Sequence, residues 1–288
     1  GYNEKKLDPP ASFISNIDYF ENFKNFLNEK YEDQPFFFWV GGHEPHRAYE
    51  YEVGLRKGKK NINEIDHIPD YWPNSVNVKT DMLDYAFEIE YFDRHLVDII
   101  DELDKRNLLE NTIVVVTSDN GMPFPRVKGQ VYPFDNRLPL AIRRGKGIKD
   151  PGRVISDYFS FSDFAPTFLD LADIPVGSHN MKPFSGKSWR NIFDNQIDPN
   201  PRPYMILGKE RHDVGRENDQ GYPVRGILKD KYFYSQNFKP DRWPAGNPET
   251  GYLNTDGSPT KTEILNLNRQ GENSTYWNYC FGKRPNEE

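Results

Sequence analysis

Two apolar segments that flank one long amphipathic stretch constrain this chain more than any other feature. Residues 36–40 (Phe-Phe-Phe-Trp-Val) and residues 112–117 (Thr-Ile-Val-Val-Val-Thr) have the length and composition of buried strands. Between them, apolar side chains recur at helical spacing over residues 79–106. A strand, a helix and a strand in that order predict a βαβ unit, and therefore an α/β fold with two interior strands and helices on the faces of the sheet.

Three further segments fit the same fold. Residues 12–30 predict a helix that Ser15 or Asn16 can cap, because apolar residues follow at helical spacing. Residues 138–142 predict a short strand, and residues 164–171 predict an amphipathic helix.

The composition and the hydrophobic pattern of the sequence change near residue 200. Residues 196–203 are rich in Pro, Asn and Asp, which is the composition of a linker. Beyond them, short apolar runs alternate with Gly, Asn, Asp and Pro, and this pattern predicts an antiparallel sheet with long loops. We therefore expect an α/β domain over residues 1–200 and a smaller antiparallel β subdomain over residues 201–288.

Composition excludes several classes of protein. Asp and Glu total 44 against 37 Lys and Arg, for a net charge of −7, and no Lys/Arg block occurs, which argues against a nucleic-acid-binding protein. No apolar run approaches the roughly 20 residues that a membrane span needs. The single cysteine, Cys280, excludes an intrachain disulfide and a Cys-based zinc site.

Polar clusters follow both expected strands, at the position where α/β sheets collect ligands. The clusters are His43-Glu44-Pro45-His46-Arg47 and Ser118-Asp119-Asn120-Gly121. Asp119 and Asn120 offer the oxygen ligands that Ca²⁺ or Mg²⁺ prefers. Lys128 and His46 would add a positive charge and a hydrogen-bond donor, so that the four side chains would suit a metal-bound tetrahedral oxyanion. Two plainer alternatives stay open. Ser118-Asp119-Asn120-Gly121 is also a common turn composition, and the imidazole of His43 or His46 can simply hydrogen-bond a loop carbonyl.

The order of these motifs resembles the sulfatase family of the alkaline-phosphatase superfamily. The matching elements are, in chain order, residues 35–40, the His-Xaa-Pro-His segment 43–46, the helix 79–106, the strand 113–117, Ser-Asp-Asn-Gly at 118–121, Lys128, and Arg-Leu-Pro-Leu at 137–140. The resemblance implies an alkaline-phosphatase-like mixed sheet flanked by helices. It also implies that Asp119 and Asn120 bind the active-site calcium, and that the catalytic residues Lys128 and His46 bind the sulfate oxygens.

Further phrases resemble the sulfatases that remove the N-sulfate of glucosamine from heparan-type glycosaminoglycans. These phrases are residues 119–125 (Asp-Asn-Gly-Met-Pro-Phe-Pro), Arg211-His212 and Tyr222-Pro223-Val224-Arg225. The resemblance implies substrate binding by Arg47, Arg211, His212 and Arg225. Guanidinium groups bind carboxylates and sulfates in bidentate fashion, although a solvated surface cluster is the alternative for residues 211–225. The resemblance also implies a periplasmic, extracellular or lysosomal protein.

One departure from the family concerns the nucleophile. Sulfatases carry a Cys or Ser in a Cys/Ser-Xaa-Pro-Xaa-Arg motif, which is oxidised to formylglycine, and an Asp-Asp metal pair; neither occurs in these 288 residues. We therefore expect the chain to be the downstream portion of a sulfatase, inactive alone, whose calcium site is shared with upstream residues. The alternatives are an O-sulfatase acting on another glycan, a phosphodiesterase-type member of the superfamily, and a non-catalytic carbohydrate-binding homologue. Asn120 and Lys128 favour sulfate, because phosphoryl enzymes of this superfamily usually carry Asp-His after the strand.

Overall fold

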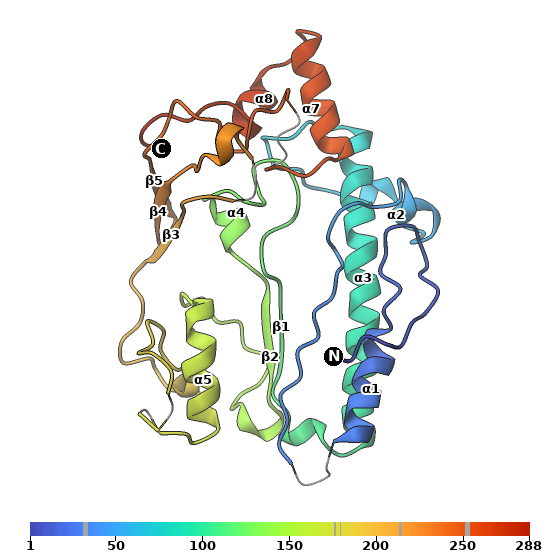
Figure 1. The fold of residues 1–288 in the computed structure, drawn as a ribbon, viewed down its shortest axis with the longest axis vertical. Coiled ribbons are helices and arrows are strands. Elements are labelled where there is room, and N and C mark those ends of the chain that lie inside the picture. The colour runs from blue at the N-terminus through green and yellow to red at the C-terminus, as the bar shows by residue number, and fades with distance from the viewer. Residues whose placement is uncertain (31–33, 176, 179, 213–214, 251–253) are drawn as a thin grey trace.

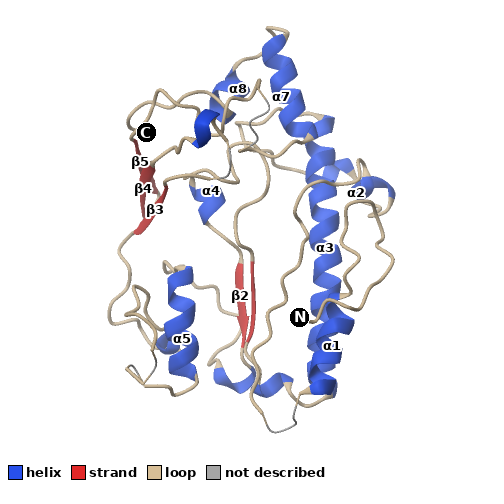
Figure 2. Ribbon diagram, viewed as in Figure 1, coloured by secondary structure: helices blue, strands red, loops and turns tan. Residues whose placement is uncertain are grey.

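The computed structural model describes the chain except for residues 31–33, 176, 179, 213–214 and 251–253. The helices are α1 (Tyr19–Glu29), α2 (Val53–Arg56), α3 (Val76–Lys105), α4 (Pro133–Asn136), α5 (Phe164–Leu171), α6 (Arg190–Phe193), α7 (Pro259–Arg269) and α8 (Thr275–Cys280). The strands are β1 (Val114–Thr117), β2 (Leu140–Arg143), β3 (Met205–Lys209), β4 (Val224–Lys229) and β5 (Tyr232–Asn237). Helix α3 runs along one side of the molecule, and the strands are short (Figures 1 and 2). Long loops join them, except for the tight turn between β4 and β5.

Helix α3 confirms the helix predicted over residues 79–106. The side chain of Ser75 caps its first turn by accepting a hydrogen bond from the Val78 amide at 3.3 Å. Its buried apolar side chains include Val78, Leu83, Phe87, Tyr91, Ile99 and Leu103. Because α3 packs against α1, α2 and α7, it is the surface on which segments remote in sequence meet.

Helix α1 begins later than the sequence suggested. Asp18 is its N-cap and accepts a hydrogen bond from the Glu21 amide at 2.9 Å, so the prediction of Ser15 or Asn16 as the cap was wrong. Ser15 has other partners instead: its hydroxyl accepts from the Ile17 amide, and its own amide donates to the Glu44 carboxylate. A tertiary contact with a residue of the later polar loop therefore displaces the local cap.

Residues 36–40 are extended, but within the described part of the chain they join no sheet. Phe36, Phe38 and Val40 pack onto the cluster between α1 and α3, whereas Phe37 and Trp39 are 73% and 77% exposed. The prediction of an interior strand was therefore wrong. The alternation of side chains across an extended backbone buries one face against the helices and leaves the other in solvent.

The β-branched run gives strand β1, as predicted, but its pairing differs from the prediction. Strand β1 pairs antiparallel with β2, with Val114 opposite Arg143 and Thr117 opposite Leu140. Among the described residues this ribbon has no third strand, and every residue of β1 is half-buried. The expected parallel βαβ unit is thus not formed: β-branched residues favour an extended backbone without specifying the partner strand.

The C-terminal region confirms the predicted antiparallel sheet. Strands β3, β4 and β5 pair in that order, and the backbone of Glu288 exchanges two hydrogen bonds with Ser235 of β5 (Figure 1). Helix α5 has the predicted bounds of 164–171. The described helices include none that is both long and apolar enough to cross a bilayer. The molecule is therefore a mixed α/β fold, with helices against small sheets.

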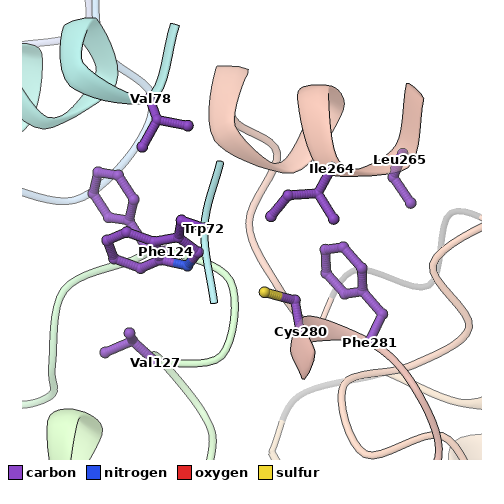
Figure 3. Close-up of a cluster of buried hydrophobic side chains, with 8 residues drawn as sticks. All are labelled: Trp72, Val78, Phe124, Val127, Ile264, Leu265, Cys280 and Phe281. Carbon is purple, nitrogen blue, oxygen red and sulfur yellow. The ribbon is translucent and has the colours of Figure 1, made fainter. Parts of the chain in front are cut away.

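A buried cluster ties the start of α3 to the C-terminal helices. Its members are Trp72, Val78, Phe124, Val127, Ile264, Leu265, Cys280 and Phe281 (Figure 3). Phe124 and Val127 are fully buried there, so the loop that follows β1 is anchored directly before Lys128. Burial raises the pKa of the Cys280 thiol to about 12, which removes this cysteine as a nucleophile or ligand.

Candidate active site

The loop that carries His43 and His46 is anchored to α1. The Glu44 carboxylate accepts hydrogen bonds from the Ser15 amide at 2.7 Å and from the Tyr19 hydroxyl at 2.8 Å. The same Tyr19 oxygen accepts a hydrogen bond from the His43 amide at 2.9 Å. Glu44 is buried, whereas His46 is exposed. The hydrogen bonds of Glu44 therefore anchor the loop to α1, while the His46 imidazole faces solvent.

Arg47 is a buried structural residue. Its Nη1 and Nη2 donate to the two carboxylate oxygens of Asp81 on α3 at 2.7 and 2.9 Å, and its Nε donates to the Pro123 carbonyl at 2.7 Å. The guanidinium also lies over the rings of Tyr49 and Phe124. Because these contacts engage all three nitrogens, they contradict the expectation that Arg47 binds substrate: it holds the His46 loop against the loop after β1.

Asp81 extends this anchor to the C-terminal region. Besides the Arg47 pair, its Oδ2 accepts a hydrogen bond from the Thr260 hydroxyl at 2.6 Å. Asp81 and Thr260 are each 1% exposed or less, and they connect α3 to the first turn of α7. The hydrogen bonds satisfy a carboxylate that would otherwise be costly to bury.

Lys128 and His46 meet at the centre of the candidate site. Lys128 Nζ lies 3.5 Å from His46 Nε2. The other ring nitrogen, Nδ1, lies 2.5 Å from the Arg47 carbonyl, which can only accept, so Nδ1 donates to it and Nε2 is the ring nitrogen that faces Lys128. The two predicted catalytic residues are thus brought together across 82 positions of the sequence.

Asp256 is a member of the site that sequence reasoning missed. Its Oδ2 lies 3.0 Å from Lys128 Nζ, and both side chains are partly exposed. It lies in the turn before α7, where Ser258 caps the helix. No local pattern marks Asp256, because its partner lies 128 residues earlier. The helix-start signal at Ser258-Pro259 would have located the turn, but not the residue that it faces.

Asp119 and Asn120 follow β1 after one residue, Ser118, as predicted. Gly121 makes the tight turn behind them: its amide donates to the backbone carbonyl and to the carboxylate of Asp135, and a Cβ at Gly121 would lie 2.5 Å from the Phe134 carbonyl. Burial raises the pKa of Asp135 to about 6. Asp119 is exposed, and no hydrogen bond or ion pair engages its carboxylate among the described residues.

The donor chemistry of this pair fits a hard cation, but the pair is only part of a ligand set. A carboxylate and an amide oxygen are ligands that Ca²⁺ accepts, and the ion takes 6–8 oxygens. In the ranges that the structure describes, no three His, Cys, Asp or Glu side chains group closely enough to hold a metal ion. Asp119 and Asn120 would therefore hold calcium only together with further oxygen donors.

His212 lies against the loop that carries Lys128. Gly129 has a φ of +75°, and a Cβ there would lie 2.4 Å from Cδ2 of the His212 ring. The absence of a side chain at Gly129 thus allows the imidazole to approach the backbone next to Lys128. Of the expected substrate-binding residues, His212 is the one whose position next to Lys128 the structure documents.

Arg211 and Arg225 are paired on the surface of the C-terminal sheet. Arg211 pairs with Asp219, and Arg225 pairs with Glu210 while also donating to the Lys209 carbonyl at 3.2 Å. Both guanidinium groups are about half exposed, so their partners can be exchanged for a ligand anion. Asp213, which falls within the surface cluster of residues 211–225 considered from the sequence, lies outside the described residues.

Lys209 supports the Lys128 loop from β3 and was also missed. Its Nζ donates to the carbonyls of Gly129 and Pro244. Burial, with the Arg216 charge as a second cause, lowers the pKa of Lys209 to about 7. Lys209 ends the strand Met-Ile-Leu-Gly-Lys, and a lysine at a strand end gave no signal that its ammonium is buried.

The fold and this site define a mixed α/β protein with an oxygen-donor pair after one strand and a contact between a lysine and a histidine. The model of the sulfatase family matches residues 2–174, and the chain belongs to that family, whose fold is alkaline-phosphatase-like. It is 26% identical to the human N-sulphoglucosamine sulphohydrolase over 84% of this chain and 50% of that protein. It is 27% identical to the ulvan-active sulfatase of Formosa agariphila over 77% of this chain and 34% of that protein.

A solved structure supports the fold. It is that of a protein in complex with its substrate D-glucosamine-2-N,6-O-disulfate, and it matches 90% of this chain and 69% of its own chain with a TM-score of 0.54 at 17% identity. The present chain spans half of the human relative and about a third of the Formosa relative.

Proposed function

We propose that this chain forms part of a sulfatase that hydrolyses the N-sulfate of glucosamine in heparan-type saccharides. The observation that carries the proposal is the contact between Lys128 Nζ and His46 Nε2, because it brings together the cation and the imidazole that two separate motifs of the family supply. The human N-sulphoglucosamine sulphohydrolase matches 84% of this chain. The residue phrases at 119–125 and 222–225 resemble the same group of sulfatases.

Each residue of the site has a role in this proposal. Lys128 and His46 bind the sulfate oxygens and stabilise the negative charge that they carry in the transition state. Asp119 and Asn120 would supply two oxygens to a calcium ion, which when bound would neutralise charge on the sulfate. The formylglycine nucleophile belongs to a motif outside these 288 residues.

The remaining residues bind the sugar or hold the site together. His212, at the edge of the Lys128 loop, contacts the saccharide, and Arg211 and Arg225 exchange their surface carboxylate partners for sulfates or carboxylates of the substrate. Arg47 orients the His46 ring through its carbonyl and fixes the loop through Asp81. The names of the relatives support a sulfated saccharide as partner. A periplasmic, extracellular or lysosomal location is proposed from the family resemblance alone.

The test gives the full-length enzyme N-sulfated glucosamine and 6-O-sulfated glucosamine separately and measures the release of sulfate. We expect release from the N-sulfated sugar. Release from the 6-O-sulfated sugar alone would overturn the N-sulfate assignment and leave the family assignment intact. Release from neither would remove the proposed activity on glucosamine.

A further inference from the structure

Asp256 places a negative charge beside the proposed sulfate-binding lysine, where it would weaken the binding of a sulfate group. The Asp256 carboxylate lies 3.0 Å from Lys128, the cation proposed to bind the sulfate oxygens. A carboxylate at that distance repels a bound sulfate and weakens the field of the lysine. Lys128 is 16% exposed and Asp256 is 28% exposed, so both groups can reach a substrate.

The two carboxylate oxygens of Asp256 have different surroundings. Oδ2 pairs with Lys128, whereas Oδ1 makes no hydrogen bond to any residue in the described ranges. A carboxylate accepts hydrogen bonds and donates none. The site therefore presents, side by side, a cation for an anionic oxygen and a vacant acceptor for an N–H or O–H group.

The turn that carries Asp256 is held on both sides, so the acceptor is preorganised. The buried Lys261 side chain donates to the Thr255 carbonyl at 2.7 Å, directly before Asp256. Ser258 caps α7 by accepting from the Lys261 amide at 3.0 Å, and Thr260 bonds Asp81. Buried contacts hold the Asp256 backbone independently of its pair with Lys128.

We propose that Asp256 is a specificity-determining residue that accepts a hydrogen bond from the sulfamate N–H of an N-sulfated amino sugar. This inference rests on the proposed function and deepens it. A sulfamate carries its N–H next to the sulfonate oxygens, which matches a vacant acceptor next to a lysine. An O-sulfate has an ester oxygen at the same position, which has no hydrogen to donate and would face the carboxylate with its own lone pairs. A site built around a substrate N–H discriminates strongly against the analogue that lacks it.

The overall reaction accounts for the value of a carboxylate at this position. Hydrolysis breaks the S–N bond, water supplies the fourth oxygen of sulfate, and both hydrogens of that water end on the nitrogen, which leaves as an ammonium group. The substrate N–H that Asp256 accepts thus becomes part of a cation. A negative charge beside the leaving nitrogen stabilises the positive charge that develops on it.

The decisive variant is Asp256→Asn in the full-length enzyme, because it separates this role from the support of Lys128. An asparagine keeps one oxygen for Lys128 and turns an NH₂ donor toward the bridging atom of the substrate. We expect kcat/KM for N-sulfated glucosamine to fall by about 10²-fold or more. For 6-O-sulfated glucosamine, kcat/KM should stay unchanged or rise, because the new donor suits the ester oxygen.

Two comparisons keep the result interpretable. Glu249→Gln removes a carboxylate from an exposed pair with Arg269 in the same region and should leave both activities unchanged. Asp256→Ala, which removes the Lys128 partner as well, should lower both activities. If Asp256→Asn lowered kcat/KM equally for both substrates, Asp256 would only support Lys128, and the inference would be overturned. An unchanged kcat/KM for N-sulfated glucosamine would overturn it as well. If the wild-type enzyme had no activity on N-sulfated glucosamine, the proposed function would be overturned together with the inference. The wild-type assay alone shows this result, so the two failures can be told apart.

Discussion

Lys128 Nζ and His46 Nε2 lie 3.5 Å apart because buried contacts hold both of their loops on a common anchor. Phe124 and Val127 fix the backbone before Lys128, and Arg47 fixes the backbone after His46. Arg47 also donates to the Pro123 carbonyl, which joins the two loops directly. An ammonium and an imidazole attract each other weakly in water, so the distance between them is set by these anchors.

Replacing Lys128 by Ala should lower kcat/KM of the full-length enzyme for its sulfated substrate by about 10²-fold or more, since it removes a group that stabilises charge on the sulfate oxygens. Sulfate release at several substrate concentrations measures the effect. Lys146→Ala removes an exposed lysine in the turn after β2 and serves as the control, with no change expected. Unchanged kcat/KM in the Lys128 variant would exclude the lysine from the catalytic machinery.

Replacing Asp81 by Asn should destabilise the chain by about 3–5 kcal/mol, because the Arg47 guanidinium would remain buried without its counter-charge. Urea unfolding of the 288-residue chain measures the free energy. The control is Glu110→Gln, which breaks the exposed pair with Arg143 and should cost about 1 kcal/mol or less. Similar losses in both variants would contradict the anchoring role of the buried pair.

The sequence predicted the elements better than their pairing. The stripe of α3 and the bounds of α5 follow from helical spacing, which depends on local residues alone. The β-branched run predicted β1, yet the parallel pairing and the interior position were wrong, since β1 pairs antiparallel with β2. A strand pattern in the sequence does not determine which strand lies next to it. Residues 36–40 show that composition does not determine burial either. Their apolar side chains suit a buried strand, but the structure packs only every second one against the helices.

The candidate site was predictable where residues follow a strand end and not where a distant segment supplies the partner. His46, Lys128, Asp119 and Asn120 come from motifs that can be read along the chain, and the structure brings His46 and Lys128 into contact. Asp256 had no local signal, since only tertiary packing brings α7 to the site. Arg47 was misassigned because an arginine beside a candidate histidine looks the same in sequence whether it faces the ligand or a buried aspartate.

Replacing Gly129 by Ala should cost more than the strain of a left-handed backbone. At a φ of +75° any Cβ is unfavourable, and here it would also meet the His212 ring at 2.4 Å. Gly152, with a φ of +85° and no atom within 4 Å of its Cβ position, isolates the backbone cost of about 1–2 kcal/mol. We expect urea unfolding to show a larger loss for Gly129→Ala than for Gly152→Ala. Equal losses would mean that the ring moves away freely.

Glu88 on α3 should make stability fall as pH rises. It is 1% exposed, and neither carboxylate oxygen has a hydrogen-bond partner in the described part of the chain. Burial, with the Glu44 charge as the second cause, raises the pKa of Glu88 from 4.5 to about 8. Between these values the unfolded chain loses the proton and the folded chain keeps it. The free energy of unfolding therefore falls by up to about 1.4 kcal/mol for each pH unit and levels off above the folded pKa.

Glu88→Gln removes this titration while keeping the shape of the side chain. Urea unfolding at pH 5 and pH 8 should show the variant gaining stability relative to the wild type as pH rises. Glu90→Gln, two positions along the same helix in an exposed pair with Lys60, should show no such trend. A constant difference between Glu88→Gln and wild type across this range would show that Glu88 is ionised when folded.

The last prediction concerns calcium. The 288-residue chain should bind Ca²⁺ with a Kd of about 1 mM or weaker, because Asp119 and Asn120 supply two side-chain oxygens where the ion takes 6–8. Isothermal titration of the chain with CaCl₂ measures this, and Asp119→Ala should abolish the residual heat. Asp241→Asn, an exposed carboxylate elsewhere, should leave it unchanged. Binding tighter than about 10 µM that Asp119→Ala removes would show that this chain completes the ligand set by itself, and the proposal of shared calcium ligands would be wrong.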